Sequence, residues 1–170
     1  MHRIVFISIL IFIGGSIAWY YRMHTGVTAS KNYSATVIKA GDTHLYPDSI
    51  KTPGDILTTD TSTVCQPTYF RSIKDVSEEA KKAIYKRYGL HYPQAKGKYE
   101  EDRLIPIELG GSNNSKNIWP QSLEPHPGYE EKNAVDNFLH AQVCTGQMTL
   151  AQAQHTVRSD WYAVYLTISK

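Results

Sequence analysis

Residues 99–121 of this 170-residue chain, YEEDRLIPIELGGSNNSKNIWPQ, constrain its fold more than any other stretch. Residues 99–109 alternate between polar and apolar side chains and then become apolar, which predicts a β-strand closed by a turn at Gly110 and Gly111. Residues 117–120 predict a short return strand, and Pro120 should end it because proline has no amide hydrogen to donate. The segment is therefore expected to fold as a compact hairpin.

A helix is expected before this hairpin. Asp75 and Glu78 have the spacing of a helix cap and its reciprocal partner, so the sequence predicts a helix from there to about residue 88. Its buried side should carry Ala80, Ile84 and Tyr88, which recur at every fourth position.

Two further helices are expected after the hairpin. Residues 129–144 are predicted to be helical, with an apolar face formed by Val135, Phe138, Leu139 and Val143. Thr149 and Gln152 form a capping pair for a last helix that extends to about residue 166, with an apolar stripe formed by Ala153, Val157, Trp161 and Val164. The order helix, hairpin, helix, helix predicts a small α+β domain.

The amino end is typical of a targeting segment. Residues 4–18 contain no charged side chain and follow His2 and Arg3. This length lies between the apolar core of a signal peptide, about 7–15 residues, and a membrane span of about 20 residues. Residues 1–29 are therefore predicted to be a signal peptide or a membrane anchor. A buried helix of the folded domain is the remaining alternative, and the lack of an amphipathic stripe argues against it.

Either targeting interpretation predicts export of the rest of the chain. The domain would then be periplasmic or secreted, or would stay anchored to the inner membrane on its outer side. Residues 30–62 are rich in polar residues without sustained periodicity and are interpreted as a polar linker or arm. The folded domain is expected to occupy residues 63–170.

The charge of the chain gives little general attraction for nucleic acid. Residues 1–29 hold two arginines and no acid, so residues 30–170 carry no net formal charge. The local excess of basic residues over acids at 71–98 suggests a phosphate-binding surface through Lys81, Lys82, Lys86 and Arg87. A solvated helix face is the alternative.

Cys65 and Cys144 are the cysteines of the chain. They lack the C-x-x-C spacing of a zinc knuckle, and in an oxidising compartment the simplest expectation is a single disulfide. Two buried free thiols are the alternative if the domain stays in the cytosol.

Residues 102–113, DRLIPIELGGSN, and 117–121, NIWPQ, resemble motifs of the HNH endonuclease superfamily. They are most similar to small exported bacterial HNH-like proteins with D-H-L-I-P-L-E-L-G-G-S-N followed by N-L-W-P-Q. The resemblance spans roughly residues 47–165, and its two central motifs together form a specific signal. It implies a ββα-metal fold, in which a hairpin and a following helix hold a divalent cation, with Mg²⁺ the first choice. The implied activity is hydrolysis of DNA or RNA.

Carried over by motif, the resemblance makes Asp102 the acidic metal ligand and Asn117 the residue that steadies the base and the turn. Arg103 stands where the family has the histidine that acts as general base. The third ligand, at the start of the next helix, has two candidates, His126 and Asn133. A surface ion pair is the alternative for Asp102, and a solvated side chain is the alternative for His126.

Arg103, in place of the family's histidine, removes the general base that the resemblance implies. A guanidinium has a pKa above about 12 and cannot accept a proton near neutrality. Loss of a general base typically costs about two to four orders of magnitude in rate. His91, His126 and His140 are the candidates to replace it in space, and a packed helix residue is the alternative for His140. The sequence therefore leaves two classes of hypothesis. The first is an exported metal-dependent nuclease, whether intact, weak or inactive, and the second is a non-catalytic periplasmic or envelope binding protein.

Overall fold

The computed structural model of the chain describes residues 46–73 and 75–169. All of these residues belong to the compact unit 39–170. The predicted signal peptide or anchor at 1–29 lies outside the described residues. Within them, no helix is both long enough and apolar enough to cross a membrane.

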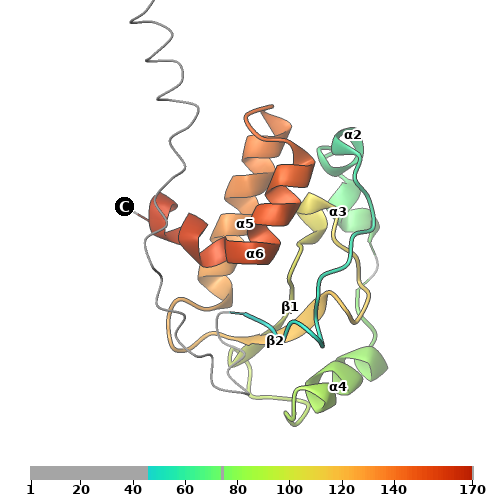
Figure 1. Ribbon diagram of the computed structural model, residues 1–170. Helices are drawn as coiled ribbons and strands as arrows, with labels where there is room; N and C mark the ends of the chain where they lie inside the picture. The colour runs from blue at the N-terminus through green and yellow to red at the C-terminus, as the bar shows by residue number, and fades with distance from the viewer. Residues whose placement is uncertain (1–45, 74, 170) are drawn as a thin grey trace, which may run out of the picture. The chain divides into compact units, whose positions relative to one another are not determined.

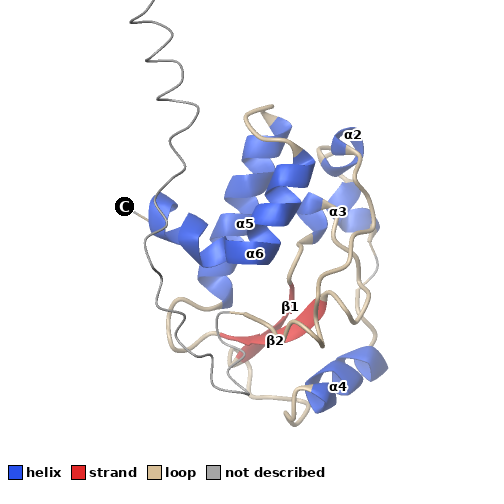
Figure 2. Ribbon diagram, in the orientation of Figure 1, coloured by secondary structure: helices blue, strands red, loops and turns tan. Residues whose placement is uncertain are grey.

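The described unit is α+β, as expected, with a two-stranded antiparallel sheet among helices (Figures 1 and 2). The long helices α5 and α6 pack against each other on one side of the hairpin, and α4 lies against β2 on the other side. The elements in chain order are α2 (Thr61–Val64), α3 (Tyr69–Ser72), α4 (Glu78–Arg87), β1 (Tyr99–Arg103), η1 (Ile107–Leu109), β2 (Ile118–Ser122), α5 (Tyr129–Cys144) and α6 (Leu150–Ile168).

The core lies between α5, α6 and η1. Helix α5 contributes Val135, Leu139 and Val143, which recur every fourth residue and are fully buried. Phe138 was expected on this face, but it is 37% exposed because it lies on the neighbouring side of the helix. Helix α6 contributes the predicted Ala153, Val157 and Trp161, and its N-terminus has the predicted capping box of Thr149 with Gln152.

Helix α4 begins later than its sequence pattern suggested. Ser77, not Asp75, is the N-cap, and its side chain accepts a hydrogen bond from the amide of Ala80. The buried pair is Ile84 with Tyr85, whereas the predicted stripe had placed Tyr88 there.

The hairpin is shorter than predicted on its first strand and longer on its second. β1 ends at Arg103, because the backbone of Ile105 is bonded to the Asn117 side chain instead of continuing a strand. β2 does not stop at Pro120, which pairs with Glu101, and the strand continues to Ser122. Proline is tolerated here because each strand of a two-stranded ribbon has a free edge.

The Gly110–Gly111 turn requires both glycines. Gly110 has φ = 79°, in the left-handed region. A Cβ on Gly111 would collide with the carbonyl oxygen of Ile105. This turn returns the chain to β2 and places Asn117 beneath it.

Part of the predicted arm, residues 52–58, lies against the hairpin. Thr52 is buried and bonds the Tyr88 hydroxyl and the Ile118 carbonyl, and Ile56 forms an isolated β-bridge with Gly111. This segment packs beside the turn on which the site is built.

Candidate functional site

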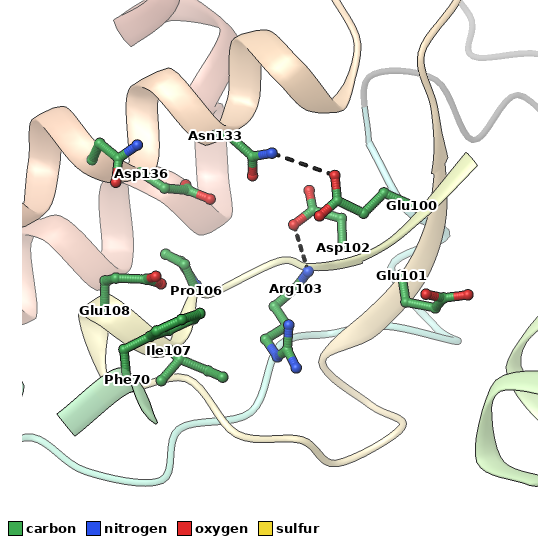
Figure 3. Close-up of a pocket in the computed structure, with 11 residues that line it drawn as sticks. Phe70, Glu100, Glu101, Asp102, Arg103, Pro106, Ile107, Glu108, Asn133 and Asp136 are labelled. Atoms are coloured by element: carbon green, nitrogen blue, oxygen red, sulfur yellow. Dashed lines mark hydrogen bonds between the residues drawn. The ribbon is translucent and has the colours of Figure 1, made fainter. Parts of the chain in front are cut away.

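A cleft of about 340 Å³ opens beside the first strand of the hairpin, between β1, η1 and α5 (Figure 3). Of the described residues that line it, five are acidic and one is basic. The lining residues are Phe70, Glu100, Glu101, Asp102, Arg103, Pro106, Ile107, Glu108, Asn133, Asp136 and Asn137. The cleft contains the residue that sequence reasoning had assigned to a metal, Asp102, and no histidine is among the described residues that line it.

Asp102 is buried at 6% exposure and faces Lys132 of α5. The Lys132 Nζ lies 3.3 Å from Oδ1 and 3.2 Å from Oδ2 of this carboxylate. Oδ1 also accepts a hydrogen bond from the amide of Arg103 at 2.5 Å. The second oxygen, Oδ2, is within ion-pair distance of Lys132 but has no hydrogen-bond partner among the described residues.

Lys132 is completely buried and bridges two carboxylates. Its Nζ donates to Asp136 Oδ2 at 2.9 Å and to the carbonyl oxygen of Arg103 at 2.8 Å. Lys132 and Asp136 are four residues apart, so they project from the same face of α5. The ammonium thus lies between the carboxylates of Asp102 and Asp136.

Burial governs the protonation of this network. Desolvation raises the pKa of Asp136 to about 7, although the Lys132 ammonium opposes the shift. Burial also raises the pKa of Asp102. The pKa of Lys132 is raised as well, because attraction to the two carboxylates overcomes the loss of hydration. Lys132 therefore stays an ammonium, and the carboxylates hold a proton more firmly than they would in water.

Arg103 lies at the end of β1 and lines the cleft. Its Nε donates to Asn113 Oδ1 at 2.8 Å, which holds the guanidinium against the hairpin loop. A guanidinium supplies donors and a fixed positive charge but cannot remove a proton from water. Position 103 therefore holds a side chain that stays protonated near neutral pH and cannot act as a general base.

Asn117 is fully buried, and its side chain binds backbone groups on the segments that surround it. Its Oδ1 accepts from the amides of Ile105 and Asp55, and its Nδ2 donates to the carbonyls of Ile105 and Ser112. The amide is saturated by these contacts, so Asn117 steadies the turn and has no capacity left to orient a catalytic base.

The two candidates for the third ligand are bonded to other partners. His126 lies within 3.2 Å of Glu124 and 2.8 Å of Glu131, and Glu131 caps α5. Asn133 lines the cleft and donates to Glu100 Oε2 at 3.4 Å. Neither Asp102 nor His126 belongs to a three-ligand cluster of His, Cys, Asp and Glu in the described part of the chain.

The basic residues proposed for nucleic-acid binding separate into different environments. Lys81 forms an ion pair with Glu78 at 3.0 Å, and Arg87 donates to backbone carbonyls of the hairpin. Lys82 and Lys86 remain exposed and line a second hollow of about 550 Å³ with His91 and Tyr92. Two lysines, not four basic residues, therefore share that surface.

Cys65 and Cys144 form the predicted disulfide, with their Cα atoms 5.5 Å apart. His140 lies beside it, with Nε2 3.3 Å from Cys144 Sγ and 3.0 Å from the Val64 carbonyl oxygen. The ligand atoms of Cys65, His140 and Cys144 lie within 4.8 Å of one another, close enough to hold a metal ion.

Lys132 and Asp136 were not singled out from the sequence. Their spacing of four residues is visible there, but the same spacing is common for exposed helix pairs. A more informative signal is that Lys132 and Asp136 each precede a buried residue, Val135 or Leu139, by three positions. This spacing brings both side chains to the edge of the core.

A scan against protein-family models, a search of curated proteins and a search of solved structures each return no match for this chain.

Proposed function

We propose that this domain is a non-catalytic binding protein on a ββα-metal, HNH-like scaffold, and that its acidic cleft receives a positively charged group. The motif resemblance and the order β1, β2, α5 support the scaffold. The chemistry of the cleft supports the loss of catalysis and the charge of the ligand.

The observation that carries the proposal is the Lys132 ammonium, 3.2 Å from Asp102 and 2.9 Å from Asp136. A metal of the family type would need the Asp102 carboxylate as a ligand. That carboxylate is instead neutralised by a fixed cation, and a second positive charge beside it would be repelled. The residues present therefore do not fit a Mg²⁺ ion at Asp102, and no hydrolytic step is derived through one.

The side chain at position 103 supports the same conclusion. Water attack on a phosphodiester needs a group that accepts a proton, and Arg103 cannot serve. Outside the network of Lys132 with Asp102 and Asp136, the lining of the cleft carries three carboxyl groups, Glu100, Glu101 and Glu108, against the one guanidinium of Arg103. The cleft therefore also repels a polyanion.

A cationic ligand matches what the cleft exposes. Glu100 and Glu108 lie on opposite sides of it, on β1 and η1, and Phe70 is 54% exposed at its margin (Figure 3). An ammonium or guanidinium on a short carbon chain can meet these carboxylates and pack on the aromatic ring. We therefore assign the ligand to organic cations, either free amines or basic side chains of a partner protein.

Export of the domain is part of the proposal. The Cys65–Cys144 disulfide supports it, because such bonds persist mainly in oxidising compartments. The apolar segment near the amino end would supply the targeting signal.

Two assays on the purified full chain test the proposal. Native protein and Arg103→His are incubated with plasmid and Mg²⁺ or Mn²⁺, and neither should nick it, because Lys132 still neutralises Asp102. Nicking by the native protein that Asp102→Ala abolishes would overturn the non-catalytic assignment.

The second assay is a calorimetric titration with spermidine. Replacing Glu100 and Glu108 by glutamine should weaken binding about fivefold, since each exposed charge pair contributes up to about 1 kcal/mol. The matched control replaces Glu79 and Glu124, which are exposed and lie outside the cleft lining. Equal weakening in both double variants would show that spermidine binds through overall charge and not through the cleft.

A further inference from the structure

A row of four polar side chains runs along α5, and the two at its carboxyl end lie outside the cleft. Lys132, Asp136, His140 and Cys144 follow one another at intervals of four residues, so each lies one turn beyond the last along the helix. The first two are committed to the buried network. The last two, His140 and Cys144, meet Cys65 from the C-cap of α2.

The donor types of this corner match zinc better than any other common metal. Two sulfurs and one imidazole nitrogen form a Cys₂His set, which zinc binds tetrahedrally with Zn–S of about 2.3 Å and Zn–N of about 2.0–2.1 Å. The corresponding atoms of Cys65, Cys144 and His140 already lie within 4.8 Å of one another. Softer donors such as these also disfavour Mg²⁺ and Ca²⁺.

The backbone requires little change to accept the ion. The two Cα atoms are 5.5 Å apart, and the sulfurs of a tetrahedral site are separated by only about 3.8 Å for the bond lengths above. Cys65 follows a helix of one turn, Thr61–Val64, whereas Cys144 and His140 are fixed on the long helix α5. The short element can therefore move toward the long one. Cys144 is exposed, so water can supply the fourth ligand.

We propose that reduction of the Cys65–Cys144 disulfide turns this corner into a Zn²⁺ site, with Cys65 Sγ, Cys144 Sγ, His140 Nε2 and a water as ligands. A dithiol reductant donates two electrons and two protons and becomes a disulfide itself, and the S–S bond of the protein opens to two thiols. Zn²⁺ then displaces both thiol protons into solvent and binds the two thiolates. His140 gives up its contact with the Val64 carbonyl and presents the lone pair of Nε2.

The disulfide and the metal site exclude each other, because the same sulfur electrons form either bond. The redox state of the surroundings thus decides whether the corner is closed covalently or by zinc. This inference does not depend on the function assigned to the cleft.

Zinc binding by the full chain tests the proposal directly. The chain is reduced with a phosphine under nitrogen, and Zn²⁺ is titrated in competition with a chromogenic chelator. The variants are His140→Ala and, as the matched control, His155→Ala, an exposed histidine of α6 outside the donor group. Circular dichroism of each sample reports whether the reduced chain is folded.

The expected result is one Zn²⁺ per reduced native chain, with at least about tenfold weaker binding in His140→Ala and unchanged binding in His155→Ala. Co²⁺ in place of Zn²⁺ should give the intense thiolate charge-transfer absorption of a tetrahedral site, only after reduction. Equal affinity in the two histidine variants would overturn the proposal, since an unfolded chain binding through its thiols alone would behave in that way. Absence of binding to the reduced chain, or equal binding to the oxidised chain, would also overturn it.

Discussion

The two ends of α5 use the same four-residue spacing for opposite purposes. Near the amino end, Lys132 and Asp136 are buried and locked into a charge network with Asp102. Near the carboxyl end, His140 and Cys144 lie closer to solvent. Reduction of the disulfide would free the Cys144 sulfur as a donor atom. The same four-residue spacing therefore gives a buried ion network at the end of α5 that the core covers. At the more exposed end it gives a group of side chains that can react with reductants and metals.

The largest expected effect lies at the buried end. Lys132→Met removes the cation and leaves two buried carboxyl groups facing each other, which should destabilise the domain by about 3–5 kcal/mol. Urea unfolding at pH 8 measures it. The exposed Lys82→Met is the control and should change the unfolding free energy by no more than about 0.5 kcal/mol. A loss below 1 kcal/mol in Lys132→Met would show that the buried charge network does not stabilise the amino end of α5.

The carboxyl end should contribute through its covalent bond and not through charge. Replacing Cys65 and Cys144 by alanine together should cost about 3 kcal/mol, because the bond closes a long loop with a sequence separation of 79 residues. The loss should not change with salt concentration or between pH 5 and 8. A cost that depended strongly on pH would indicate that charged groups, and not the cross-link, stabilise this end.

The next test concerns the hairpin, where the side chain of Asn117 holds the turn. Asn117→Ala leaves buried amides and carbonyls of the turn without partners, so we expect a loss of about 2–3 kcal/mol in unfolding free energy. Asn133→Ala, which loses one long surface hydrogen bond, should cost less than about 0.5 kcal/mol. Equal losses in the two variants would show that the Asn117 contacts do not fix the turn.

Measured per pH unit, the smallest effect is the pH dependence at the buried end. Asp136 has a pKa of about 7 in the fold, against 3.8 when unperturbed, beside Lys132, Asp102 and Glu108. Between those values the folded state holds a proton that the unfolded chain has released. Stability therefore falls as pH rises from about 4 to 7, by roughly 1 kcal/mol per pH unit at most.

Asp136→Asn should flatten this dependence, because asparagine does not titrate and still offers an oxygen to Lys132. Unfolding curves from pH 4.5 to 8 measure the slope, and the exposed Glu130→Gln serves as the control. A native slope of the opposite sign would contradict the assigned protonation.

Local sequence patterns predicted the long helices well. Features that depend on contacts between distant parts of the chain were predicted less accurately. The bounds of α5 and the capping box of α6 depend on neighbouring residues, and both were predicted from spacing. The end of β1 was not, because it depends on Asn117, which lies beyond the turn and takes over the backbone of Ile105.

The cleft shows the same limit. Asp102 and Arg103 were singled out by motif, and Asn133 as a candidate for the third ligand. All three line the cleft, but Lys132, the partner of Asp102, was not expected there. A lysine and an aspartate four residues apart usually form a solvated pair. Only the approach of Asp102, 30 positions earlier in the chain, turns that pair into a buried network. His126 was expected near Asp102 but is held by Glu124 and Glu131.

The central claim, that the Lys132 ammonium stands where a metal would be bound, is tested most directly by Mn²⁺ binding measured by electron paramagnetic resonance on the full, oxidised chain. The native protein and Asp102→Asn are titrated side by side. The account predicts the same weak binding in both, because Asp102 is already neutralised in the native fold. A tight Mn²⁺ site in the native protein that disappears in Asp102→Asn would contradict it.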